Sequence, residues 1–143
     1  MSLDISEAKR EAITATVARS VLGTDVYDIH THLYDPAFGE LLLWGIDDQL
    51  VYHYLVAEAF RHFKVDYNYF WNLPKENQAE MIWDALFIDN SPLSEACRGV
   101  LTALNRLGLD ANKRDLQDIR KWFKEQDPSE YITRCMELAK VSK

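Results

Sequence analysis

Hydrophobic positions in this chain recur mostly at the three- and four-residue spacing of amphipathic helices. The pattern predicts six helices, over residues 6–20, 47–63, 74–87, 92–108, 116–123 and 127–138. Local signals support their ends: Ser6 can cap the first helix, and Gly23 can stop it. Asp127-Pro128-Ser129-Glu130 combines an N-cap, a proline at the first helical position and a capping-box acid. The sequence therefore predicts a mainly helical protein.

One segment departs from the helical spacing. The β-branched and aromatic pair Val26-Tyr27 precedes Asp28-Ile29-His30-Thr31-His32, so a short strand ending in two histidines is predicted. Alternate side chains share a face of a strand, so His30 and His32 project the same way. Two neighbouring imidazoles can bind one Zn, Mn or Fe-type cation. A histidine pair with this spacing also occurs by chance.

The residues around this pair resemble a known family. Asp28–Leu33 resembles the first barrel strand of the amidohydrolase superfamily, where an HxH at the strand's carboxyl end holds a catalytic metal. Phe38–Trp44, Tyr52–Glu58 and Ser94–Leu101 follow in order and look like the start of a uronate (glucuronate) isomerase. The resemblance runs over essentially the whole chain. It indicates the N-terminal third of such an enzyme.

The resemblance also implies roles for individual residues. His30 and His32 would be metal ligands, while Tyr54 would lie over the substrate with His53 beside it. Side-chain chemistry, rather than the resemblance, suggests that Arg61 or Arg98 could meet the carboxylate of a sugar acid such as glucuronate or galacturonate through paired hydrogen bonds. Each residue has a simpler explanation: Tyr54 can be the edge of an apolar core, His53 can be structural, and Arg61 can pair with an acidic side chain. These explanations remain open at the level of sequence.

Chain length limits the fold that can be expected. A (β/α)8 barrel takes ~250 residues or more, whereas this chain has 143. We therefore expect a mainly α unit with one short β-strand, the N-terminal portion of a metal-dependent (β/α)8 TIM barrel. Residues 1–36 would supply the leading helix and barrel strand 1, and residues 37–143 a helical insertion, together forming one unit.

The family's further metal-ligand aspartate comes from the last barrel strand, which this chain lacks. Two histidines alone leave coordination open, so we expect a divalent metal, Zn or Mn, to be weakly held. By the same reasoning, the chain resembles a truncated segment that would be inactive in isomerisation by itself. Whether it acts as an enzyme is thus uncertain from sequence.

Composition narrows the possible partners. With 48% hydrophobic and 27% charged residues the chain can bury a core, and a net charge of −7 argues against nucleic acid. It has no secretory segment and no apolar run of ~20 residues, so a cytoplasmic protein without a membrane partner is expected. Cys97 and Cys135 fit buried thiols better than a disulfide. Unpaired strand edges would favour a homo-oligomer.

Two other function classes stay open. A stand-alone helical interaction or regulatory domain would explain why each predicted helix has its own start and stop signals. A metal-dependent hydrolase of the amidohydrolase superfamily would also begin with an HxH strand. The Phe38–Trp44 and Tyr52–Glu58 motifs favour an isomerase over generic hydrolases.

Overall fold

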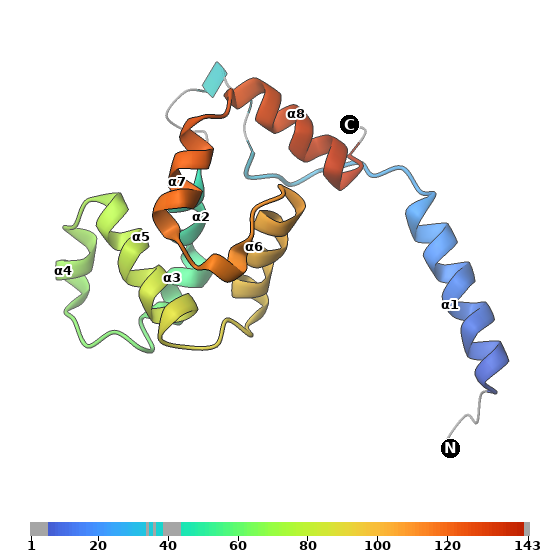
Figure 1. Ribbon diagram of the computed structural model, residues 1–143, viewed down its shortest axis with the longest axis horizontal. Helices are drawn as coiled ribbons and strands as arrows, with labels where there is room; N and C mark the ends of the chain where they lie inside the picture. The colour runs from blue at the N-terminus through green and yellow to red at the C-terminus, as the bar shows by residue number, and fades with distance from the viewer. Residues whose placement is uncertain (1–5, 34, 36, 39–43, 142–143) are drawn as a thin grey trace.

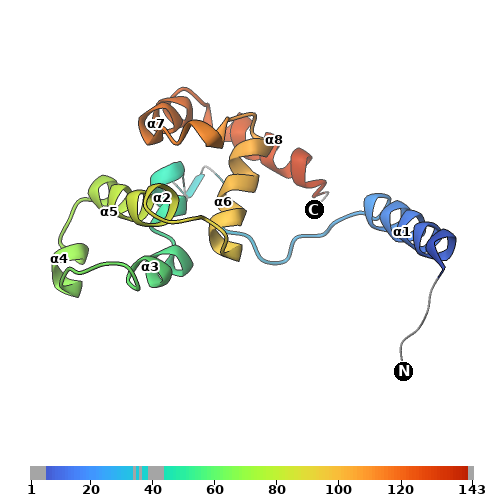
Figure 2. The ribbon, with the colours of Figure 1, turned by 60° about the horizontal axis from the view of Figure 1, so that its bottom comes forward.

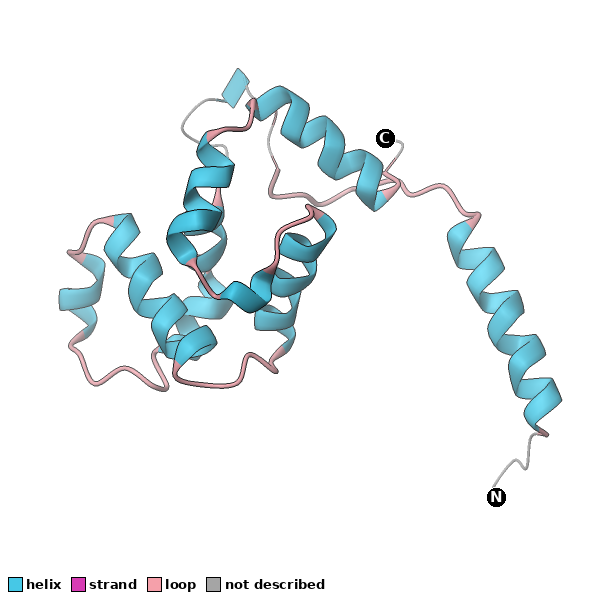
Figure 3. Cartoon of the chain, in the orientation of Figure 1, coloured by secondary structure: helices cyan, strands magenta, loops and turns pink. Residues whose placement is uncertain are grey.

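Helices make up most of the protein, and they form a body from which the first helix projects (Figures 1 and 2). The computed structural model describes residues 6–33, 35, 37–38 and 44–141. Among these residues there are helices, turns and loops but no β-strand of two or more residues (Figure 3). The Phe38–Trp44 motif falls mostly outside the described residues. The mainly α prediction is confirmed.

The first helix, α1 (Glu7–Leu22), has no buried residue, and Gly23 follows as its C-cap. Among residues 44–141 the helical body then contains, in chain order, the α-helices α2 (Ile46–Leu50), α3 (His53–Ala59), α4 (Tyr67–Trp71), α5 (Lys75–Trp83), α6 (Glu95–Arg106), α7 (Leu116–Lys124) and α8 (Pro128–Ala139). A π-helical turn, Asp84–Ile88, extends α5, and a 3₁₀ turn, Ala111–Lys113, precedes α7.

The hydrophobic core lies between these short helices. Helix α2 packs against α5 and α7, and α3 packs against α5 and α6. The core includes side chains with no exposed surface: Leu50, Phe70, Ile82 and Leu104. The π-helical turn carries Phe87 onto Trp83, and the two rings stack with centroids 4.6 Å apart. Burial of this apolar surface is the main stabilising contribution to the body.

Helix starts follow the local capping chemistry. Oδ1 of Asp127 accepts hydrogen bonds from the backbone N–H groups of Ser129 (2.9 Å) and Glu130 (3.0 Å), with Pro128 at the first helical position. The predicted start of α8 is thereby confirmed. The predicted start of α6 at Pro92 is wrong by a few residues. Ser94 caps this helix instead, its hydroxyl accepting from the N–H of Cys97 at 3.1 Å.

The predicted continuous helix over residues 47–63 is wrong. The chain breaks between α2 and α3, because Tyr52 has an extended backbone (φ −69°, ψ 142°) and is the N-cap of α3. The break has a tertiary cause: Leu50 and Leu55 are both buried, and the two short helices meet different neighbours. A straight helix would place residues five apart on different faces. Helix α4, which starts at Asp66, was not predicted.

The predicted strand over residues 26–32 also requires correction. Val26 forms one isolated parallel bridge with Val141, and residues 29, 30 and 32 lie in bends. A strand gains its stability from a ladder of hydrogen bonds with a neighbour. Within the described residues only Val141 supplies such a neighbour, so the segment stays an extended loop with a single bridge.

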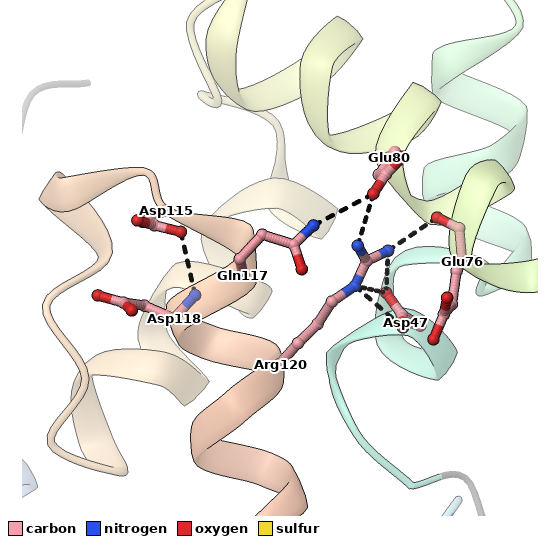
Figure 4. Close-up of polar contacts among 7 residues, drawn as sticks. All are labelled: Asp47, Glu76, Glu80, Asp115, Gln117, Asp118 and Arg120. Atoms are coloured by element: carbon pink, nitrogen blue, oxygen red, sulfur yellow. Dashed lines mark hydrogen bonds and ion pairs between the residues drawn. The ribbon is translucent and has the colours of Figure 1, made fainter.

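A buried guanidinium connects three helices of the body (Figure 4). Nε of Arg120 in α7 donates to both carboxylate oxygens of Asp47 at 2.9 and 3.2 Å, and NH1 donates to Glu80 at 2.6 Å. NH2 donates to the backbone carbonyl of Glu76 at 2.8 Å. Gln117 adds a bond to Glu80 at 3.2 Å. The network fixes α7 against α2 and α5.

Two further expectations concern thiols and membranes. Cys97 is buried and Cys135 is half-buried, and both are free thiols, as predicted. Burial raises the pKa of both, which keeps them protonated near neutral pH. Within the described part of the chain, no helix has both the length and the apolar character needed to cross a bilayer.

Candidate functional site

Two local hydrogen bonds shape the loop that carries the histidine pair. Oδ1 of Asp28 accepts from the backbone N–H of His30 at 2.9 Å, and Oγ1 of Thr31 accepts from that of Leu33 at 3.1 Å. These short side-chain caps turn the backbone in the way Asx and Ser/Thr turns do. Both histidines remain exposed in this loop.

The two imidazoles converge. Nε2 of His30 and Nε2 of His32 lie 3.3 Å apart, and the ring centroids are 5.1 Å apart. The prediction that both rings project the same way therefore agrees with the geometry. Bends at residues 29, 30 and 32 bring the two rings together. The predicted alternation of side chains along a strand is not the cause.

The separation of these nitrogens fits a shared metal ion. Zn–N bonds of about 2.0–2.1 Å at a tetrahedral angle place two ligand nitrogens about 3.4 Å apart. The observed 3.3 Å lies at that value. Neutral imidazole is also a ligand type that Zn, Mn and Fe accept. Among the residues described, however, no group of three or more His, Cys, Asp or Glu side chains could hold a metal.

Tyr52 joins the pair from the start of α3. Its hydroxyl oxygen lies 2.9 Å from Nε2 of His32, and the two rings meet edge to face with centroids 5.0 Å apart. The contact spans 20 positions of sequence. It depends on the break before α3, because the N-cap position directs the side chain of Tyr52 away from the helix toward the loop. The sequence analysis gave this residue no role.

A cavity of about 740 Å³ opens beside His32. Its wall consists mainly of apolar side chains from α3, α6 and α8, and its rim contains Tyr52, Tyr54 and Arg106. Asp48, also at the rim, accepts from Lys75 Nζ at 2.5 Å and from the Trp44 N–H at 3.1 Å. The cavity thus combines a mainly apolar lining with a few polar and charged groups, of which Tyr52 contacts His32.

The predicted site residues of α3 lie at different distances from this cavity. Tyr54 lines it and is 64% exposed, so its hydroxyl is accessible from the cavity. His53 packs on Tyr54 with ring centroids 4.1 Å apart but does not line the cavity. Arg61 is exposed in the turn after α3, also outside the lining. The structure therefore brings together His30, His32, Tyr52 and Tyr54, and leaves Arg61 apart.

The floor of the cavity carries two groups that stay neutral. Burial is the main cause that raises the pKa of Tyr131, and its contact with Cys135 raises it further. Burial also raises the pKa of Cys135. Neither group therefore supplies charge at neutral pH. Two charged residues that line the cavity had no predicted role: Asp48 in α2 and Arg106 in the last turn of α6.

Comparison with known proteins shows which family the chain is related to. No protein-family model and no curated protein matches the chain. Among solved structures, a uronate isomerase from Bacillus halodurans C-125 matches it with 47% sequence identity and a TM-score of 0.87. The match covers 99% of this chain and 33% of that chain. The chain is therefore a relative of the uronate isomerases, as its motifs predicted, and spans a third of the length of the enzyme it matches.

Proposed function

We propose that this chain supplies the metal-binding segment of a uronate isomerase in the amidohydrolase superfamily, built on a (β/α)8 barrel. The observation that carries the proposal is the 47% identity to a uronate isomerase over 99% of the chain. The convergence of His30 and His32 adds support, because its 3.3 Å spacing suits one divalent ion. The substrate would be a sugar acid such as glucuronate, and the location the cytoplasm.

The reaction would move hydrogen between C1 and C2 of the sugar acid, which interconverts an aldose and a ketose. A bound Zn or Mn would supply a Lewis acid for the carbonyl and hydroxyl oxygens. His30 and His32 would hold that ion. Tyr54, whose phenol is accessible at the cavity rim, would donate a hydrogen bond to a substrate oxygen. His53 would hold the ring of Tyr54 through their contact.

Recognition of the substrate carboxylate requires a cation. Guanidinium groups bind carboxylates through paired hydrogen bonds. Arg61 was predicted for this role from its side-chain chemistry, and it stays a proposal. Arg106 lines the cavity itself and is the alternative group for the same contact.

The proposed role assigns only part of the active site to residues 1–143. A further metal ligand and the base that moves the proton would come from parts of the barrel beyond the 33% of the related enzyme that this chain matches. We therefore expect residues 1–143 by themselves to hold zinc weakly and to show no turnover of glucuronate. Turnover by the purified 143-residue polypeptide would contradict this expectation.

A chimaeric enzyme tests the proposed function directly. Residues 1–143 would replace the matching third of the Bacillus halodurans enzyme, and isomerisation of glucuronate would be measured. We expect an active chimaera whose activity falls by more than about 100-fold with His30→Ala or His32→Ala, because each removes a metal ligand.

His62→Ala provides the matched control for this chimaera. His62 is exposed in the turn after α3 and does not line the cavity, so its loss should leave activity within about twofold. A folded chimaera without activity, or one in which His30→Ala remains fully active, would contradict the proposed function. Metal content measured on the same proteins should fall in the His30 and His32 variants alone.

A further inference from the structure

We propose that Tyr52 is the third protein donor of the metal site formed by His30 and His32. This inference rests on the proposed function, because it takes the histidine pair as metal ligands. It adds a residue that neither the motif nor the resemblance assigned. The hydroxyl oxygen of Tyr52 lies 2.9 Å from Nε2 of His32.

The first argument is a count of protons and lone pairs at Nε2 of His32. An imidazole nitrogen carries either one proton or one lone pair in the ring plane, and so makes one strong hydrogen bond. Here Nε2 of His32 has two close neighbours, Nε2 of His30 at 3.3 Å and the hydroxyl of Tyr52 at 2.9 Å. One hydrogen bond cannot satisfy both contacts. A cation contacted by all three atoms would satisfy each of them.

The second argument is the spacing of these atoms. Donors about 2.0–2.2 Å from a metal, at tetrahedral or octahedral angles, lie about 2.8–3.6 Å from one another. Both measured separations, 3.3 and 2.9 Å, fall in that range. A phenol oxygen also suits the metals that accept imidazole together with oxygen ligands. Nε2 of His32 therefore lies at the spacing of neighbouring corners of a coordination sphere from each of the other two donor atoms.

The third argument is that packing fixes the ring of Tyr52. It contacts the ring of His32 at 5.0 Å, that of His53 at 4.2 Å and that of Tyr54 at 5.6 Å between centroids. The extended backbone at the N-cap of α3 sets its direction. Tyr54 lies two residues later within the helix, and its ring contacts are to Tyr52 and His53. Both tyrosines line the cavity, and Tyr52 is the one whose hydroxyl meets a histidine of the pair.

The test is a zinc titration of the full 143-residue chain, followed by nuclear magnetic resonance of its histidine and tyrosine rings. Tyr52→Phe keeps the ring contacts and removes only the hydroxyl oxygen. Loss of one donor should weaken zinc affinity by about tenfold or more. In the wild-type chain, the resonance of the ring carbon that bears the Tyr52 hydroxyl should shift as zinc is added. It should shift together with the resonances of the two histidine rings. A purely structural role of Tyr52 would not produce that shift.

Tyr54→Phe is the matched control, with an expected change in zinc affinity below about twofold, and unchanged amide spectra would show that both variants fold. Equal or tighter zinc binding by Tyr52→Phe, with the histidine shifts retained, would overturn the role of Tyr52 and leave the proposed function standing. Absence of zinc-induced shifts at His30 and His32 in the wild-type chain would overturn the role of Tyr52, whereas the chimaera tests the proposed function independently. His30→Ala should abolish the shifts altogether.

Discussion

At the scale of single residues, Arg120 stabilises the packing of α7 against α2 and α5. Its side chain is 7% exposed, and it donates to two carboxylates and one backbone carbonyl from different segments. Burial raises the pKa of Asp47, so this carboxylate is costly to bury and depends on the guanidinium that faces it. The pair is thus strongly coupled, and removing one partner leaves the other as an uncompensated charge.

We predict that Arg120→Met lowers the free energy of unfolding by about 3–5 kcal/mol, because Asp47 is left buried without its partner. Urea unfolding followed by circular dichroism would measure the loss. Arg98→Met is the matched control: Arg98 lies exposed on α6, and its replacement should change stability by less than about 0.5 kcal/mol. A loss below about 1 kcal/mol for Arg120→Met would show that the network contributes little.

Individual residues of the candidate site also differ in whether the sequence alone could identify them. His30 and His32 are two positions apart, so their common direction was predictable even though the predicted strand was wrong. Tyr52 and Arg106 could not be found in the same way. Tyr52 reaches His32 across 20 positions, and only where the chain breaks before α3. Arg106 lines the cavity only because the fold places α6 beside the same cavity as α3 and α8.

A local cap made the start of α8 predictable, whereas the starts of α4 and α6, capped by Asp66 and Ser94, were not predicted correctly. Helix α8 starts where the Asp127-Pro128 pair indicated, because the cap depends on residues within three positions of one another. The division into α2 and α3 was missed, since it follows from contacts with α5, α6 and α7. Local chemistry thus sets individual helix ends, whereas tertiary packing decides whether an apolar stripe becomes one helix or two.

This local control at α8 gives a prediction at the element scale. Asp127→Ala removes the acceptor for the N–H groups of Ser129 and Glu130 and should lower the free energy of unfolding by about 1 kcal/mol. Asp127→Asn keeps an acceptor oxygen and should retain most of that stability. Thermal unfolding of the three proteins would compare them. Equal stability of the alanine and wild-type proteins would exclude a contribution from the cap.

At the scale of the whole molecule, two segments far apart in the sequence meet. Val26 precedes the histidine loop, Val141 follows α8, and the two form a parallel bridge. In a parallel β/α arrangement, adjacent strands are joined by a crossover connection that usually contains helix. Here the helical body occupies the connection between them. The bridge thus has the orientation that the proposed barrel requires of its first two strands.

The exposed surface of α1 leads to a prediction about association. Ile13, Val17 and Val21 form a stripe at four-residue spacing, with 46%, 55% and 67% of their surface exposed. An isolated helix of 16 residues is marginal in water, so α1 gains stability if this stripe is covered. A second copy of the chain can cover it, as the predicted homo-oligomer requires. We expect residues 1–143 to have a mass above that of the 16.6 kDa monomer in light scattering at micromolar concentration.

A single charge on the stripe should reverse this association. Val17→Glu places a carboxylate in the middle of the apolar stripe, where burial against a second copy is costly, and should return the chain to a monomer. Ala15→Glu adds the same charge on the opposite side of α1 and should leave the mass unchanged. A monodisperse wild-type monomer, or an oligomer that both substitutions leave intact, would show that α1 does not mediate association. Because both variants carry the same added charge, any difference between them reports the position of the stripe and not net charge.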